Sequence, residues 1–347
     1  MTVDSPIAGV PSGRMQGNQR LTDLKYRWPA RYRASWAALL LIVLGAILVA
    51  PQALSGPSIT LVTALAGVLA LASFGQSLIV MIGAIDLSIS AIVSVAAGIV
   101  VHYAADGGSV WLLVVASLFV SVLLSLVNGF LIVILKLNAL IVTLATVGIM
   151  VGLIQLWTGV ALSGTGRTPQ ALVDIADFDL LNINAVFILA VVTGAGLAAF
   201  LNKTRVGKSI GITGANPRAA QVLGIRVKAV QMMVFALAGM LYGLAGVMLA
   251  AYVGSPDVLS GGIYQLLAIT VAGVAGILFT GGPGSMASVI SSCLFLVLLD
   301  QVLSVKGMDA GARVVIQGLV LAIAVAAITI GQYATSRFSM LRIRRSN

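Results

Sequence analysis

The chain has 347 residues, of which 60% are hydrophobic and only 9% are charged, and its formal net charge is +10. This composition lies outside the range of soluble globular domains and within that of integral membrane proteins. The positive charge does not indicate nucleic-acid binding, because the basic residues stand at the ends of apolar runs, where lipid headgroups and the cytoplasmic side attract them. The sequence therefore predicts an all-α, polytopic membrane protein that contacts lipid and no nucleic acid.

Few residues could support catalysis or hold a metal ion. Cys293 is the one cysteine, His102 is the one histidine, and the ten acidic residues are all Asp. A single cysteine forms no intrachain disulfide, and one His without Glu supplies neither a catalytic constellation nor ligands at metal spacing. We therefore expect no catalytic, cofactor or metal site in this chain and no enzyme activity of its own.

Apolar runs separated by Gly or polar breaks predict about ten transmembrane helices, each of which needs about 20 residues. These runs are residues 36–54, 59–80, 86–104, 110–135, 138–158, 183–201, 230–252, 263–280, 286–304 and 312–333. Residues 1–35 are basic and lack the apolar core of a signal peptide, so they predict a cytoplasmic tail. Residues 334–347 predict a second, basic cytoplasmic tail, which leaves residues 36–333 as the membrane domain.

The basic residues also predict the orientation. With the N-terminus inside, the cytoplasmic segments hold six Lys or Arg in the N-terminal tail, one in the 135–138 turn, six in residues 203–229 and four after Gly331. Only Arg167, Lys306 and Arg313 fall on the other side. This bias follows the positive-inside rule and predicts that both termini are cytoplasmic.

Two Gly-containing polar breaks recur in the sequence. GAIDLSIS at residues 83–90 and TGGPGSMAS at residues 280–288 each lie between two apolar runs, on the cytoplasmic side of the predicted topology. Six spans separate them, which keeps the orientation and predicts a parallel internal repeat. Interrupted segments at corresponding positions of two halves point to a translocation path. The alternative is that both breaks are ordinary tight turns.

The stretch TGANPRAAQVLGI at residues 213–225 is polar and basic among apolar runs. Asn216 can cap a helix, Pro217 suits its first position and Gly224 can end it in a left-handed conformation. The sequence therefore predicts a helix of about two turns at residues 217–223.

So short a helix needs a support. Its side chains divide into an apolar set and a polar set, namely Ala219, Ala220, Val222 and Leu223 against Arg218 and Gln221. Two supports stay open on physical grounds. The helix could lie on lipid headgroups as an amphipathic connector, or it could bind a partner protein.

Residues 207–209, Gly-Lys-Ser, match the end of a nucleotide-binding P-loop, but the first Gly of that motif is replaced by Asn202. The element before them is a membrane helix rather than a strand. We therefore expect no nucleotide site here.

Four blocks, in order, resemble the permease subunits of ATP-binding cassette importers, in the branch that carries ribose, xylose, arabinose and galactosides. Residues 213–225 resemble the cytoplasmic coupling segment, and GAIDLSISAIVS at 83–94 is similar to the Gly-Ile-Asp-Leu-Ser signature. NALIVTLATVGIMVGL at 138–153 and TGGPGS at 280–285 resemble two further blocks. The resemblance covers about residues 60–330.

The resemblance implies a bacterial inner-membrane permease without ATPase activity. It implies separate ATPase subunits that bind ATP and Mg, and an extracytoplasmic sugar-binding protein, for which we expect docking on the loops 159–182 and 253–262. It implies an ATPase-coupling role for Asn216, Pro217, Arg218, Ala219, Ala220, Gln221, Leu223 and Gly224. A signature or gating role falls on Gly83, Asp86, Leu87, Ser88, Gly281, Gly282 and Gly284. Since the ATPases act in pairs and each chain has one coupling helix, we expect two permease copies, most simply a homodimer.

Polar residues inside the spans have two interpretations. Asp86 is a functional candidate because it is ionisable at membrane depth, and the alternative is that it caps the helix that follows, with Ser88 assisting. The uncharged candidates for a sugar path are Asn128, Thr143, Thr146, Gln155, Gln265, Gln301 and Gln317. The alternative for each is an ordinary hydrogen bond between helices. Similarly, Gly239 and Gly243 predict close helix packing, either within the chain or with a second copy.

Two other kinds of transporter are alternatives to the sugar permease. An ion-coupled secondary transporter needs intramembrane ionisable groups, and only Asp86, His102 and Asp300 are available, all near helix ends. A permease for branched-chain amino acids or nucleosides of the same superfamily is the nearer alternative. The run Ile85–Ser88 favours the sugar branch, although Ala84 and Pro283 depart from its pattern, and the sequence does not identify the sugar.

Overall fold

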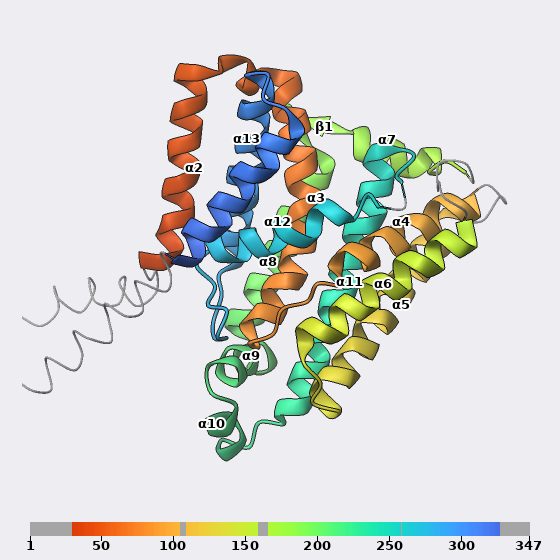
Figure 1. Cartoon of the computed structure of the whole chain (residues 1–347), viewed down its shortest axis with the longest axis vertical. Coiled ribbons are helices and arrows are strands. Elements are labelled where there is room, and N and C mark those ends of the chain that lie inside the picture. Colours follow the sequence, from red (N-terminus) through yellow and green to blue (C-terminus); the bar gives the residue numbers. More distant parts are fainter. Residues whose placement is uncertain (1–29, 105–108, 159–165, 258, 327–347) are drawn as a thin grey trace, which may run out of the picture.

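The computed structural model describes residues 30–104, 109–158, 166–257 and 259–326 (Figure 1). The predicted tail 334–347 and most of the tail 1–35 lie outside these residues. Within the described part, helices form the structure, apart from one two-stranded hairpin. The predicted all-α class is confirmed.

Among the described residues, seven helices are long and apolar enough to cross a membrane, and three more are apolar but shorter. The seven are α2 (Ala30–Val49), α3 (Gly56–Met81), α5 (Val110–Gly129) with its π-helical continuation η2 (Phe130–Ile134), α6 (Ala139–Thr158), α8 (Ala185–Lys203), α11 (Val227–Val253) and α13 (Met286–Val305). The shorter three are α4 (Ile89–Ala104), α12 (Gly262–Val274) and the helix Ala310–Ala326. Each of the ten predicted runs overlaps one of these helices, which confirms a polytopic membrane protein.

Several predicted boundaries were wrong, and local backbone chemistry explains them. The first helix ends at Val49 rather than near residue 54, because Pro51 begins a separate 3₁₀ turn, η1 (Pro51–Leu54). The eighth ends at Val274 rather than near residue 280, and Gly276 follows it with a φ of +75°. The third begins at Ile89, three residues later than predicted. Apolar composition alone does not reveal where such breaks stop a helix.

The core is built around α3 and α11. Residues 66–81, the last four turns of α3, are all buried, and the largest fully buried side chains include Phe74 from α3 and Tyr242 and Phe235 from α11. Gly239 and Gly243 of α11 pack against Ser121 of α5, so closely that an added Cβ would lie within 2.6–2.8 Å of that residue's atoms. The small-residue face of α11 is therefore a contact within the chain, which resolves the alternative left by the sequence.

The connecting elements gather at two opposite ends of the helix bundle (Figure 1). At one end lie α7 (Gln170–Asp177) and a hairpin of β1 (Asp179–Leu180) and β2 (Ile183–Asn184). At the other end lie α9 (Arg205–Ala215) and α10 (Pro217–Val222), which carry the basic segment singled out in the sequence. The two ends of the bundle thus differ in the elements that they offer to partners.

Candidate functional site

The short helix α10 forms as the sequence predicts. The side chain of Asn216 caps it, because its Oδ1 accepts a hydrogen bond from the amide of Ala219 at 3.0 Å. Pro217 occupies the first helical position, and Gly224 follows the helix with a φ of +78°. The helix ends at Val222, one residue earlier than predicted.

Most of the α10 surface faces away from the rest of the chain. Val222 is 88% exposed and Leu223 is 69% exposed, and Arg218 and Gln221 are exposed beside them. Of the side chains predicted to form the apolar face, Ala220 alone is buried. The apolar tip of α10 therefore lies open for contact with another molecule.

The helix α9 joins α10 to the membrane helices. Thr204 caps α9 by accepting a hydrogen bond from the amide of Gly207 at 2.9 Å. Gly207 packs against the backbone of Phe200 and Leu201, where a side chain would not fit. The Gly-Lys-Ser sequence at residues 207–209 is thus helical and packed rather than a loop that could cradle phosphate groups.

The C-terminal turn of α9 meets both Gly-containing breaks at one point. Gly214 packs so closely against Met81 that an added Cβ would overlap the carbonyl oxygen of Met81, and it also faces the amide of Gly282. Gly281 packs against Gly214 and Gly83 in the same way. The amide of Gly282 donates a hydrogen bond to the Met81 carbonyl at 2.9 Å. We call Gly83, Gly214, Gly281 and Gly282 the glycine junction.

Three members of the glycine junction have backbone angles that favour glycine. The φ values are +80° at Gly83, +92° at Gly281 and +123° at Gly282. Gly284 lies next to them, where an added Cβ would be 3.0 Å from the sulfur of Met81. The two breaks therefore lie side by side, and each contains a glycine with positive φ. The parallel repeat itself stays a prediction.

Asp86 is fully buried between α3 and α4. Its Oδ1 accepts hydrogen bonds from the amide of Ser88 at 2.8 Å and from the hydroxyl of Ser88 at 2.5 Å. This is the amide that a capping Asp would bind, but the α-helix begins only at Ile89, so the bonds close a turn before the helix. No hydrogen bond to Asp86 Oδ2 occurs within the described residues.

A chain of side-chain hydrogen bonds leads from Asp86 to two other helices. Asn128 of α5 donates from Nδ2 to the hydroxyl oxygen of Ser88 at 2.8 Å. Thr146 of α6 donates from its hydroxyl to Asn128 Oδ1 at 2.6 Å. Asp86, Ser88 and Asn128 are fully buried, and Thr146 is half-buried. We call these four residues the polar chain.

The other residues suggested for a sugar path are spread over several helix contacts. Gln265 of α12 accepts a hydrogen bond from Ser90 of α4 at 2.9 Å, and Gln301 of α13 donates to Ser58 of α3 at 3.4 Å. Thr143 bonds the carbonyl of Ala139 in its own helix at 2.8 Å, and Gln155 is exposed on α6. The structure therefore gathers Asn128 and Thr146 at one place and leaves the rest apart from them.

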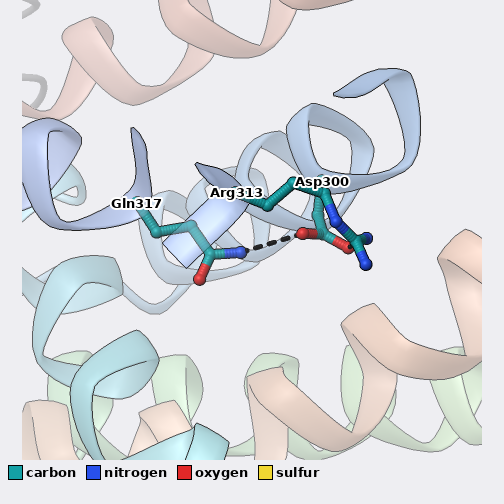
Figure 2. Close-up of polar contacts among 3 residues, drawn as sticks. All are labelled: Asp300, Arg313 and Gln317. Carbon is teal, nitrogen blue, oxygen red and sulfur yellow. Dashed lines mark hydrogen bonds and ion pairs between the residues drawn. The ribbon is translucent and has the colours of Figure 1, made fainter. Parts of the chain in front are cut away.

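Gln317 belongs to a separate cluster at the contact between α13 and the last helix. Figure 2 shows its side-chain amide bonded to Asp300, at 3.1 Å, beside Arg313. Arg313 Nη1 forms an ion pair with Asp300 Oδ2 at 2.8 Å. Sequence reasoning missed this pairing, and also missed Gly214. The sequence offers one signal for this ion pair: Asp300 and Arg313 have opposite charges and lie on either side of the turn that joins two apolar runs.

The chain is similar to known transport proteins. The model of the family described as "Branched-chain amino acid transport system / permease component" matches residues 58–325. The "Autoinducer 2 import system permease protein LsrC" of Escherichia coli O157:H7 is 32% identical over 286 residues, which are 82% of each chain. The protein of the same name from Salmonella typhi is 30% identical over 283 residues, 81% of this chain and 80% of that protein. No solved protein structure matches the chain significantly.

Proposed function

Because the chain belongs to the branched-chain amino acid transport system permease family, we propose that it is the membrane-spanning subunit of an ATP-binding cassette importer for a sugar-type solute. Its similar proteins are named as autoinducer 2 import permeases, which supports the same solute or another monosaccharide-type solute here. The family description keeps branched-chain amino acids as the second candidate class. Both candidates share the same architecture and differ only in what is carried.

The open tip of α10 carries the proposal. Val222 and Leu223 are apolar yet exposed, and Arg218 and Gln221 beside them offer donors for hydrogen bonds. A helix of about two turns that is fixed at both ends by local caps presents these side chains in one rigid arrangement. We expect it to fit a cleft on a separate ATPase subunit, which binds ATP and Mg and passes its motion to the permease. We expect α10 and both termini to lie in the cytoplasm of a bacterium, with the chain in the inner membrane.

Val222→Asp tests the docking role directly. A charged group at a position that is 88% exposed should leave folding unchanged but oppose burial in an apolar cleft, so we expect at least a tenfold loss of bound ATPase subunit. The measurement is the amount of ATPase that co-purifies with the solubilised permease from its native membrane. Leu181→Asp is the matched control, because Leu181 is 87% exposed in the hairpin at the opposite end.

The two variants have distinct outcomes. Wild type and Leu181→Asp should recover the ATPase equally, and Val222→Asp should insert normally without it. Equal recovery with all three proteins would contradict docking through α10. Recovery of a homo-oligomer without any ATPase from wild type would instead support a secondary transporter. Release and identification of the ligand on the co-purified binding protein separates a sugar from an amino acid.

A further inference from the structure

We propose that the polar chain is a latch that holds α6 against α5 and the first break, and that it opens and closes during each transport cycle. This inference rests on the proposed function, since it assigns how motion of α10 reaches a membrane helix. The latch consists of Asp86, Ser88, Asn128 and Thr146, and Thr146 is its contact with α6.

The carboxylate of Asp86 determines which residue donates and which accepts at each hydrogen bond of the polar chain. An ionised Asp86 only accepts hydrogen bonds, so the Ser88 hydroxyl must donate to it and leaves its own oxygen to accept from Asn128 Nδ2. The carbonyl oxygen of Asn128 then faces α6, so the residue that it meets on α6 must supply a hydrogen-bond donor. The hydroxyl of Thr146 meets this requirement, and it also lies 3.0 Å from the carbonyl oxygen of Val142 in its own helix. A flipped Asn128 amide would place two acceptors together at Ser88. Such directional chains reinforce each bond.

The Thr146 bond is one of the contacts that hold α6 in place, beside the apolar packing of Ile154 against α4. The helix carries many exposed apolar side chains, among them Ile141, Leu144 and Leu156. Lipid tails are as apolar as these side chains, so no hydrophobic force drives α6 onto its neighbours in a membrane. Packing and hydrogen bonds must hold it, and Thr146 donates across to α5.

The backbone next to Asn128 is suited to a change of position. Asn128 and Gly129 end the α-helical part of α5, and the next five residues are π-helical. Gly129 packs directly against the ring of Phe235, where a Cβ would lie 2.8 Å from the ring. Single π-helical turns are frequent at functional positions because they offer an alternative hydrogen-bonding register.

The other end of the latch leads to α10 through backbone contacts. Asp86 stands three residues after Gly83, a member of the glycine junction. The junction joins the first break to the end of α9, directly before Asn216 and α10. Motion of α10 therefore displaces the backbone that carries Asp86 and Ser88. Full burial of Asp86, Ser88 and Asn128 leaves them without access to solute in this conformation, which distinguishes a latch from a binding site.

Thr146→Val tests the latch, because Val has the shape of Thr but no hydroxyl. The loss of one hydrogen bond should change the ratio of the two α6 positions about fivefold, which corresponds to about 1 kcal/mol. Thr146→Ser keeps the hydroxyl and should behave as wild type. The measurement is a distance distribution between spin labels on Leu156→Cys of α6 and Leu48→Cys of α2, both highly exposed. The native Cys293 is buried and should stay unlabelled.

The assay uses the full complex in proteoliposomes, with and without Mg-ATP as the only added ligand. A shifted distribution for Thr146→Val but not for Thr146→Ser, together with higher ATP hydrolysis in the absence of solute, would support the latch. Identical distributions for Val, Ser and wild type would overturn it. Asn128→Leu serves as a second variant. Because it already removes the bond to Thr146, the double variant with Thr146→Val should be no worse than Asn128→Leu alone. A wild-type complex without ATPase would instead refute the proposed function.

Discussion

Asp86 places a carboxylate inside the helix bundle without a basic partner. The one ion pair among the described residues joins Asp300 and Arg313, so the hydrogen bonds of Ser88 alone offset the burial of Asp86. A buried polar group without a partner costs about 1–3 kcal/mol. The side chain at position 86 must therefore accept hydrogen bonds, whether or not it is charged.

Two substitutions at this position separate the hydrogen bond from the charge. Asp86→Asn keeps an acceptor for the amide of Ser88, whereas Asp86→Ala leaves that amide unpaired. We expect the Ala variant to be less stable than the Asn variant by about 1–3 kcal/mol, seen as a lower Tm in detergent. Asp174→Ala, at an exposed position, should change stability by less than about 0.5 kcal/mol. Equal Tm values for Asp86→Asn and Asp86→Ala would show that the hydrogen bond from the Ser88 amide to residue 86 does not stabilise the fold.

Two of the three glycines in α9, Gly211 and Gly214, are about one turn apart and face different surroundings. A Cβ on Gly211 would lie 3.6 Å from Pro283, which is an ordinary contact. A Cβ on Gly214 would overlap the Met81 carbonyl. The sequence shows both as small residues in the same helix and gives no means of ranking them.

This difference predicts opposite effects of the same substitution. Gly211→Ala should be neutral or slightly stabilising, since Ala favours a helix over Gly by about 1 kcal/mol. Gly214→Ala should force α9 away from the breaks, so that the ATPase still binds α10 but solute-stimulated ATP hydrolysis falls at least tenfold. The ratio of stimulated hydrolysis to bound ATPase measures this. Normal stimulation in Gly214→Ala would exclude the glycine junction as the connection.

At the scale of helices, the sequence predicted elements whose signals are local. The short helix at 217–223 was correct to one residue, because Asn216, Pro217 and Gly224 each act on their own neighbours. The end of α12 was missed, since the Gly that follows it resembles the many glycines inside helices. The polar chain was beyond reach, because Asp86, Asn128 and Thr146 are brought together only by the packing of α5 and α6 on the first break.

At the scale of the whole molecule, the apolar runs were sufficient to predict the class of fold. They did not predict the relative positions of the helices. Composition predicts burial in a membrane without saying which face meets lipid and which meets protein. Gly239 and Gly243 illustrate this, since their close contact with α5 required the structure. Pairs of helices that are distant in sequence leave no periodic signal.

The number of α10 helices in each permease chain predicts the composition of the complex. The described part of each chain has one such helix, and a pair of ATPase subunits presents two clefts, so we expect two permease copies with two ATPase subunits. Native mass spectrometry of the solubilised complex measures the stoichiometry. A single copy of this chain accompanied by a related permease would replace the homodimer with a heterodimer.

The glycine junction also affects how such a transporter can diversify. Its contacts are made by carbonyl and amide groups and by the absence of side chains, so substitution cannot adjust them gradually. The exposed residues Arg218, Val222 and Leu223 are under no such restriction within this chain. Mutation of these residues can therefore change which ATPase subunit the permease binds, while the contacts of the glycine junction stay the same. Exchange of α10 alone should then transfer the preference for an ATPase partner between related importers.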